Sequence, residues 1–202
     1  MHPAPAFRET DVERLSALIA RAGLALIVGV RDGRPLVAHA PVLLSGERLR
    51  FHLARSNPLT AALQAAPHAL AVVTGPQAYV SPDWYGLEDQ VPTWNYLSAE
   101  IEGPLRVLDA AETTALLDDL SAVFEAKLAP KPPWTRAKMS PGRFEAMLVG
   151  ITAFEMTVER LEGVRKLSQN KSAEAQGQLA NALFERGGEH AAALGRLIVK
   201  KS

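Results

Sequence analysis

The sequence predicts an α+β protein that is mainly β, built as an antiparallel barrel with inserted and C-terminal helices. Two observations carry this prediction. Apolar runs of strand length follow one another across turns of two or three residues, which join antiparallel strands but are too short for parallel ones. Segments with the period of a helix occur near the start, in the middle and at the end of the chain.

The first predicted element is an amphipathic helix over residues 11–22, where apolar residues recur at helical spacing. Thr10 begins the pattern TDVE, in which Glu13 would complete a capping box at the start of the helix. Gly23 follows at the position where a left-handed residue commonly ends a helix.

A meander of three strands is predicted next, with the sequences LALIVGV, RPLVAHAPVLL and RLRFHLA. Asp32-Gly33, between the first two strands, is a dipeptide typical of two-residue hairpins. Residues 45–47 supply the second turn. Asn57-Pro58 then predicts a short helix, because Asn57 is a good N-cap and proline suits the first helical position.

The later elements alternate between strands, helices and connectors. HALAVVTG predicts a buried strand, residues 76–92 an irregular loop, and TWNYLSAEIEGPLRVL a long strand. Residues 111–127 predict a helix, and Ser140-Pro141 opens a shorter one. The segment GITAFEMTVERLEG predicts one further strand.

The chain is expected to divide near its C-terminal end. Residues 1–171 hold all the predicted strands and would form the barrel domain. Residues 172–202 predict two helices separated by Gly187-Gly188. We expect this helical extension to pack on the barrel or on a partner subunit.

Composition and charge argue against several classes of function. The chain has 22 basic and 22 acidic residues, whereas nucleic-acid binders usually carry a basic excess. It has no cysteine, and its five histidines lack ligand spacing, so we expect no metal site. No apolar run reaches the length of a membrane span, and the N-terminal residues lack the pattern of a secretory signal. We therefore expect a cytoplasmic protein with no membrane partner.

Three segments carry candidate binding residues. In FHLARSNP, residues 51–58, a basic side chain and a hydroxyl precede a helix start, an arrangement that can cradle a phosphate. The alternative is a capped helix beside a solvated arginine. The second segment holds five aromatic residues that would stack on a ring system or else pack in a core or dimer interface: Tyr79, Trp84, Tyr85, Trp94 and Tyr96.

The third segment, EGVRKLSQNKS, spans residues 162–172 and combines basic, hydroxyl and amide side chains around Leu167. Such a run usually forms a solvated turn. Its order also suits a segment laid along a ligand. The chain shows no standard catalytic signature, so no catalytic residue is assigned.

Taken together, these segments resemble the PaiB family of FMN-binding split-barrel proteins. The matching pieces FRETD, HLARSNP, GPQAYVSPDWY, PTWNY and LEGVRKLSQNKS occur in one order over about residues 1–175. The resemblance implies an antiparallel split β-barrel related to the pyridoxamine-phosphate oxidases and flavin reductases. It also implies a homodimer with FMN at the subunit interface. One departure is GLEDQV, which is shorter than the corresponding loop expected in the family.

The resemblance also implies which residues contact the cofactor. The FMN phosphate would lie near HLARSNP and the flavin ring near PTWNY, with KLSQNK contributing from around the same interface. A basic side chain near the ring would stabilise reduced flavin. The cofactor-binding residues implied are His52, Arg55, Ser56, Asn57, Thr93, Trp94, Asn95, Lys166, Ser168 and Gln169.

The function implied by the resemblance is that of a flavin sensor or negative transcriptional regulator. Since the chain has no basic excess, we expect regulation through a partner or through a surface of the dimer rather than through direct DNA binding. An alternative is an FMN-dependent oxidoreductase that uses a nicotinamide nucleotide and a small acceptor. A third possibility is a haem-binding split barrel with His39 or His52 as the axial ligand.

Overall fold

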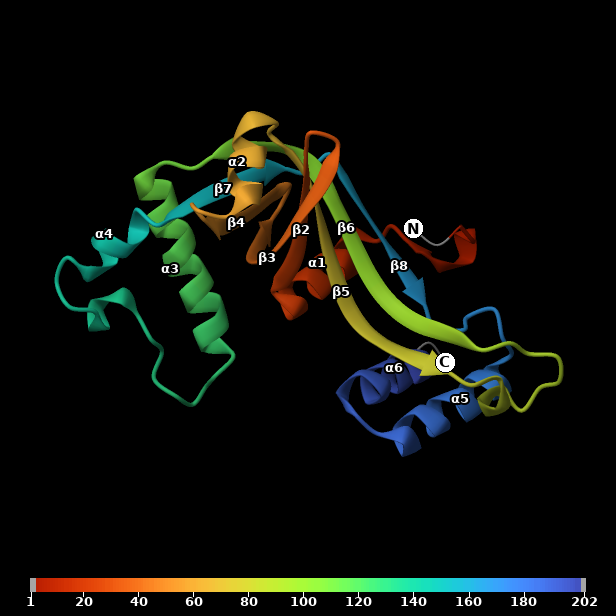
Figure 1. Ribbon diagram of the computed structural model, residues 1–202. Helices are drawn as coiled ribbons and strands as arrows, with labels where there is room; N and C mark the ends of the chain where they lie inside the picture. The colour runs from red at the N-terminus through yellow and green to blue at the C-terminus, as the bar shows by residue number, and fades with distance from the viewer. Residues whose placement is uncertain (1–2, 201–202) are drawn as a thin grey trace. The chain divides into compact units, whose positions relative to one another are not determined.

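The computed structural model describes residues 3–200 of the chain (Figure 1). Its strands are β1 (Arg8–Glu9), β2 (Leu24–Arg31), β3 (Arg34–Ser45), β4 (Arg48–Ala54), β5 (His68–Val80), β6 (Thr93–Val107), β7 (Ile151–Thr157) and β8 (Arg160–Lys166). Its α-helices are α1 (Val12–Ala22), α2 (Pro58–Ala65), α3 (Ala110–Ala126), α4 (Arg143–Leu148), α5 (Ala173–Arg186) and α6 (Glu189–Val199). Short 3₁₀ helices are η1 (Pro5–Phe7), η2 (Pro82–Tyr85) and η3 (Arg136–Lys138).

The strands pair in the order β1-β8-β6-β5-β2-β3-β4-β7, and β6 also pairs with β7. Because of that additional pairing, the run of strands from β6 to β7 closes on itself as a barrel. The pairs β2–β3, β3–β4, β4–β7 and β6–β7 are all antiparallel. The predicted antiparallel barrel of the α+β class is therefore confirmed.

The chain forms two compact units, and each is described by itself. The barrel unit comprises residues 19–73 and 100–161. The terminal unit comprises residues 3–18, 74–99 and 162–200. No helix within the described residues 3–200 is long and apolar enough to cross a membrane.

The hairpin predicted at Asp32-Gly33 is confirmed in the barrel unit. Both residues have positive φ, 54° and 72°, and Arg31 pairs with Arg34 across the turn. Positive φ at both central positions defines the turn whose twist matches that of the flanking strands. Asn57 likewise caps α2 as predicted, since its side-chain oxygen accepts from the Leu59 N–H at 2.9 Å.

Strand β4 presents two different faces because its side chains alternate. Leu49, Phe51 and Leu53 are buried, and the Phe51 ring stacks on Phe154 of β7 with centroids 5.4 Å apart. Arg50, on the other face, donates to Asp119 of α3 at 2.9 Å. Helix α3 therefore lies over the face of β4 that carries Arg50 and the neighbouring alternate residue His52 (Figure 1).

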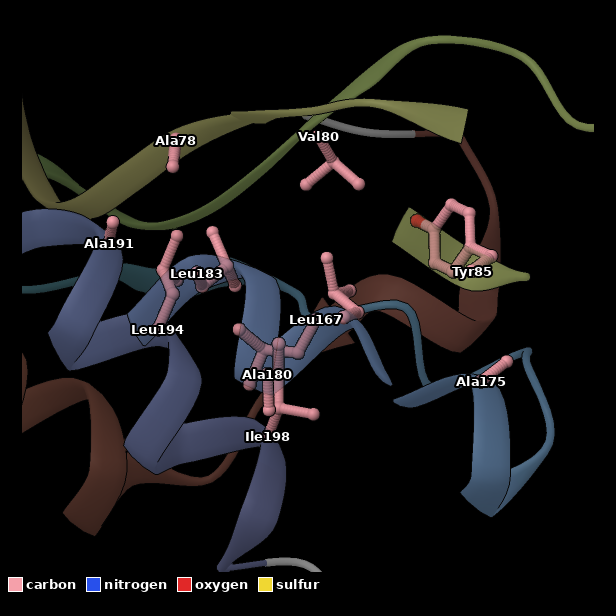
Figure 2. Close-up of a cluster of buried hydrophobic side chains, with 11 residues drawn as sticks. Ala78, Val80, Tyr85, Leu167, Ala175, Ala180, Leu183, Ala191, Leu194 and Ile198 are labelled. Carbon is pink, nitrogen blue, oxygen red and sulfur yellow. The ribbon is translucent and has the colours of Figure 1, made fainter. Parts of the chain in front are cut away.

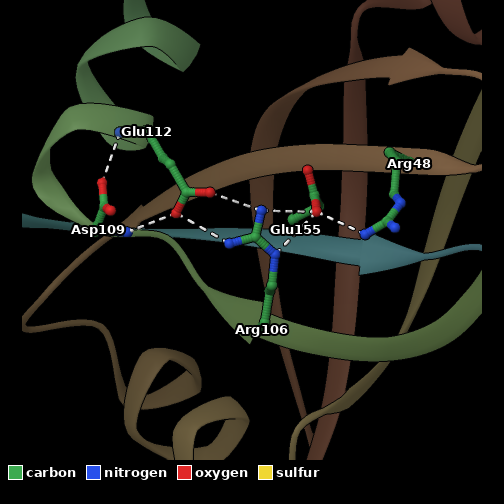
Figure 3. A network of polar contacts seen from close by, with 5 residues as sticks. All are labelled: Arg48, Arg106, Asp109, Glu112 and Glu155. Atoms are coloured by element: carbon green, nitrogen blue, oxygen red, sulfur yellow. Dashed lines mark hydrogen bonds and ion pairs between the residues drawn. The ribbon is translucent and has the colours of Figure 1, made fainter.

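Helix α3 begins at a complete capping box (Figure 3). The Asp109 carboxylate accepts from the Glu112 N–H at 2.8 Å, and the Glu112 carboxylate accepts from the Asp109 N–H at 3.0 Å. Arg106 joins Glu112 to Glu155 of β7, which also accepts from Arg48 at 2.9 Å. These bonds tie the start of α3 to the barrel wall, and hydrogen bonds to both carboxylates raise the pKa of Arg106.

The Asp109→Ala substitution is expected to lower the free energy of unfolding by about 1 kcal/mol, the usual contribution of an N-cap side chain. The loss arises because the Glu112 N–H would no longer have a side-chain acceptor. Urea denaturation measures the change. Asp109→Asn is the control, because its amide oxygen can still cap the helix. Equal losses in the two variants would contradict a capping role.

Several predicted boundaries are wrong for local reasons. The helix predicted from residue 11 begins at Val12, and Asp11, not Thr10, accepts from a first-turn N–H, that of Arg14. The strand predicted to end at Gly75 continues to Val80, and its last residues bury Ala78 and Val80 at alternate positions.

Two further boundaries differ near the later strands. The single strand predicted over residues 150–163 is β7 and β8, separated at Val158-Glu159. The N–H groups of these two residues bond instead to the carbonyls of Glu47 and Glu102. The short helix predicted to open at Ser140-Pro141 begins at Arg143, because Gly142 adopts a left-handed conformation before it.

The core of the terminal unit is formed by α5, α6, the end of β5 and η2 (Figure 2). Leu167, Leu179, Leu183 and Leu194 are fully buried there. Gly187-Gly188 separates α5 from α6 as predicted, and both glycines have positive φ. The division of the chain into a domain over 1–171 and an extension over 172–202 stays a prediction.

Candidate functional site

A buried polar network lies in the terminal unit where β6, η2 and the segment after β8 meet. Ser168 is at its centre and has a left-handed backbone, with φ of 57°. Its Oγ lies 2.7 Å from Tyr85 Oη and accepts from Asn95 Nδ2 at 2.9 Å. All three residues are at most 3 % exposed. The network fixes the start of β6 against the predicted KLSQNK segment.

A cavity of about 180 Å³ adjoins this network. Lys166, Lys171 and Thr93 line it, together with the aromatic rings of Phe7 and Tyr85. The Lys166 ammonium donates to Thr93 Oγ1 at 2.7 Å and lies 5.6 Å from the centre of the Phe7 ring. We call this cavity the lysine pocket.

The second lysine of the pocket, Lys171, donates to Gln90 and lies 5.3 Å from the centre of the Tyr85 ring. Neither Lys166 nor Lys171 forms an ion pair with a carboxylate within the described residues. Two ammonium groups without carboxylate partners give the pocket a positive potential, which favours an anionic group.

Gln169 has a different role in the structure. Its amide nitrogen donates to the carbonyls of Ala6 and Arg165 at 2.8 and 2.6 Å, and its oxygen accepts from the Leu167 N–H at 2.7 Å. The side chain therefore holds the loop in shape. A contact of Gln169 with a cofactor stays a prediction.

Trp94 lies outside the lysine pocket. Its side chain is 53 % exposed and meets Tyr79 edge to face, with ring centroids 6.3 Å apart. It lines a different hollow with His190 and the Gly187-Gly188 link. The structure thus brings Thr93, Asn95, Lys166, Ser168 and Gln169 together in one region. Thr93, Lys166 and Ser168 line the lysine pocket, whereas the Trp94 side chain lies outside it.

The predicted phosphate segment, residues 52–57, belongs to the barrel unit. Arg55 is exposed and donates to the Ile151 carbonyl at 3.4 Å, while Ser56 is exposed at the turn before α2. Asn57 is used as the cap of α2. His52 lines a cavity under α3, and Arg55 lines another cavity with Asp109. These four residues therefore do not converge on one pocket.

The predicted cofactor-binding residues do not include six others that line the lysine pocket: Phe7, Tyr85, Gln90, Val91, Asn170 and Lys171. Phe7 belongs to FRETD, and Tyr85 and Lys171 lie in segments that the sequence already singles out. Gln90 lies in GLEDQV, the stretch that departs from the family. The sequence shows these charged and aromatic residues but not that they meet in one pocket. Their convergence depends on contacts between residues more than 70 positions apart, such as Lys166 with Thr93 and Lys171 with Gln90.

Burial raises the pKa of Tyr85, and its hydrogen bond with Ser168 opposes this effect. Above the ordinary tyrosine pKa of about 10, the folded state therefore holds this proton more tightly than the unfolded chain does. We expect stability to fall as the pH rises above about 10. Urea denaturation across this range should show a shallower decline in Tyr85→Phe. The exposed Tyr79→Phe should keep the wild-type slope, and equal slopes in all three proteins would contradict the assignment.

The chain is similar to known proteins both in sequence and in fold. Residues 1–160 match the family model described as "Putative FMN-binding domain". The chain is 29% identical over 170 residues to the protease synthase and sporulation protein PAI 2 of Bacillus subtilis, covering 82% of this chain and 81% of that protein.

Two of the solved structures similar to this chain illustrate the shared fold. One is the flavocytochrome Anf3 from Azotobacter vinelandii, with a TM-score of 0.65, 14% identity and coverage of 82% of this chain and 72% of that one. The other is the FAD and heme binding protein from Mycobacterium smegmatis, with a TM-score of 0.60, 21% identity and coverage of 90% and 80%. At these identities the likeness concerns the fold.

Proposed function

Because this chain belongs to the family of FMN-binding domains that matches its residues 1–160, we propose that it is a flavin sensor of the PaiB type that regulates transcription through a partner protein. The resemblance to PaiB is confirmed by the family match and the relative from Bacillus subtilis. The fold is the predicted antiparallel split barrel, and the cofactor is FMN. The sensing role and its location in the cytoplasm are proposals.

The observation that carries the proposal is the pair of ammonium groups in the lysine pocket. FMN offers a phosphate and the carbonyl oxygens of its ring as acceptors for such donors. Lys166, Thr93 and Lys171 supply donors, and Phe7 and Tyr85 supply flat apolar surface. The residues present therefore fit part of a flavin.

The size of the pocket supports a homodimer. Small-molecule sites generally enclose about 300 Å³ or more, whereas the lysine pocket measures about 180 Å³. One chain would thus hold only part of the cofactor there. We propose that a second copy of the chain supplies the remaining wall, as the family resemblance implies.

We propose distinct tasks for the residues around the pocket. Lys166 and Thr93 contact FMN, whereas Asn95 and Ser168 hold the two segments in register. Arg55 and Ser56 remain the proposed phosphate contacts, since both are exposed and Arg55 forms no ion pair within the described residues. When bound, FMN supplies reversible electron transfer at its ring.

The lining of the lysine pocket favours sensing over catalysis. Among the described residues that line it, none is a carboxylate or a histidine, the side chains that most often transfer protons. Since the formal net charge of the chain is zero, phosphate neutralisation offers little for direct DNA binding. These features support a redox-responsive protein that acts on another protein.

Titration of the purified protein with FMN, followed by absorption and by sedimentation velocity, tests the cofactor and the dimer. We expect a shifted flavin spectrum and a dimer that is stabilised by FMN. A monomer that binds FMN with full affinity would overturn the dimeric site. Steady oxidation of a nicotinamide nucleotide in the presence of small acceptors would show that the protein is an oxidoreductase and not a sensor. A mobility shift of promoter DNA at low salt would show that it binds DNA directly and not through a partner protein.

A further inference from the structure

The second ammonium group of the lysine pocket, that of Lys171, is not among the proposed flavin contacts. Those contacts, Lys166 and Thr93, bond to each other at 2.7 Å. Lys171 lies just before α5 and bonds instead to Gln90. Gln90 and Val91 also line the pocket, and both belong to GLEDQV, the stretch that departs from the family. This part of the lining therefore differs from the family pattern.

The hydrogen bonds of Lys171 leave it able to bind a ligand. An ammonium group has three donors, and within the described residues Lys171 uses one of them, on the side-chain oxygen of Gln90. The amide nitrogen of Gln90 donates to the Glu88 carbonyl at 2.7 Å, so the amide is held at both ends. The Tyr85 ring, whose centre is 5.3 Å from the ammonium, adds a cation–π contact. Two donors of Lys171 thus remain for a ligand in the pocket.

The charge of the pocket favours an anion as that ligand. Among the described residues no carboxylate lines the pocket, and neither Lys166 nor Lys171 forms an ion pair. The acidic residues of the neighbouring loop, Glu88 and Asp89, are exposed and lie outside the lining. Both lysines are half-buried, so water screens their charges less than those of exposed lysines. A carboxylate in the pocket would form charge-assisted hydrogen bonds.

The size of the pocket and its apolar lining restrict the rest of the ligand. The cavity measures about 180 Å³, whereas sites for drug-sized molecules enclose about 300 Å³ or more. Phe7, Tyr85 and Val91 line it beside the two lysines. This surface favours a compact apolar body, whereas a second carboxylate would lose its hydration against it without a partner. The lining therefore fits a small molecule with one carboxylate and an apolar body.

We propose that the lysine pocket binds a small apolar monocarboxylate, whose carboxylate accepts hydrogen bonds from Lys171, in addition to the flavin that Lys166 contacts. Lys171 determines the specificity for the acid, and Gln90 positions the ammonium. The role of this acid as the signal that the sensor detects rests on the proposed function. Its binding to the pocket does not depend on that function and is measured without FMN.

Calorimetry and ligand-observed NMR with benzoate, and with benzamide as an uncharged probe of similar shape, test the proposal on the full chain. Wild type should bind benzoate, and Lys171→Met should weaken this binding about 10- to 100-fold, the effect of a hydrogen bond to a charged group. Gln90→Glu should weaken it similarly, because its carboxylate would pair with Lys171. Both variants should alter benzamide affinity much less. Lys127→Met, in the barrel unit, is the matched control and should keep wild-type affinity for both.

Three results would overturn the proposal: no benzoate binding to wild type, equal benzoate affinities for wild type and Lys171→Met, or displacement of benzoate by FMN, which would make Lys171 part of the flavin site. Benzoate binding to the FMN-loaded protein that changes the absorption of the flavin supports neighbouring sites. The two proposals also fail separately. Benzoate binding to a protein that does not bind FMN would remove the sensor function and keep this site, whereas FMN binding without benzoate binding would remove this site alone.

Discussion

Replacing Ser168 with alanine is expected to lower the free energy of unfolding by about 2–4 kcal/mol. The substitution removes the hydroxyl that both Tyr85 Oη and Asn95 Nδ2 contact, at 2.7 and 2.9 Å. All three side chains are at most 3 % exposed, so the groups left without a partner stay largely shielded from bulk water. Each buried group left unsatisfied costs about 1–3 kcal/mol. Urea denaturation with two independent probes measures the loss.

Ser121→Ala is the matched control for Ser168→Ala. The Ser121 hydroxyl donates to the Leu117 carbonyl of its own helix, so its removal leaves no second buried side chain unsatisfied. We expect a change of about 0.5 kcal/mol or less there. Ser168→Gly separates the hydroxyl from the backbone, because glycine relieves the positive φ of this position. If Ser168→Ala costs no more than Ser121→Ala, the network does not stabilise the fold.

A double-mutant cycle with Tyr85→Phe tests whether the network acts as a unit. Tyr85→Phe removes the phenolic hydroxyl but leaves the ring and the Asn95–Ser168 bond in place. If the two hydroxyls stabilise one another, the double mutant should lose less than the sum of the single losses. Strict additivity would show that they act independently.

Local signals predicted much of the barrel unit. The Asp32-Gly33 hairpin and the Asn57 cap depend on residues within a few positions of one another, so backbone preference and spacing were sufficient to predict them. The strand boundary at Val158-Glu159 was missed for the opposite reason. Its N–H groups bond to Glu47 and Glu102, which are distant in sequence and leave no local mark.

The candidate site shows the same contrast. Thr93, Asn95, Lys166 and Ser168 were named from the sequence, and the structure brings them together across 73 residues of chain. The left-handed backbone conformation of Ser168 could not be predicted from its residue type, because serine seldom adopts positive φ. The segment FHLARSNP predicts His52 and Arg55 in one phosphate cradle, but alternation along β4 and the turn after it direct them to different cavities.

Replacing Lys166 with methionine is expected to weaken FMN binding about 10- to 100-fold, which corresponds to about 1.5–3 kcal/mol for a hydrogen bond to a charged group. Methionine keeps an unbranched apolar side chain while removing the ammonium that lies over the Phe7 ring. Fluorescence quenching of FMN measures the affinity. Lys127→Met, a lysine of the barrel unit that bonds to the Ala20 carbonyl, is the control and should bind FMN normally.

The redox potential separates a direct contact of Lys166 with the flavin from a structural role. An ammonium beside the ring stabilises the reduced cofactor, so Lys166→Met should lower the midpoint potential of bound FMN by about 30 mV, or about 1.4 kcal/mol for a two-electron couple. Lys166→Arg keeps the positive charge, so its midpoint potential should stay close to that of wild type even where its different shape weakens FMN affinity. Thr93→Val removes only the hydroxyl that orients the Lys166 ammonium, so it should lower the midpoint potential less than Lys166→Met does. Weaker binding with an unchanged potential in Lys166→Met would place the ammonium near the phosphate, because a charge there alters affinity for both redox forms alike.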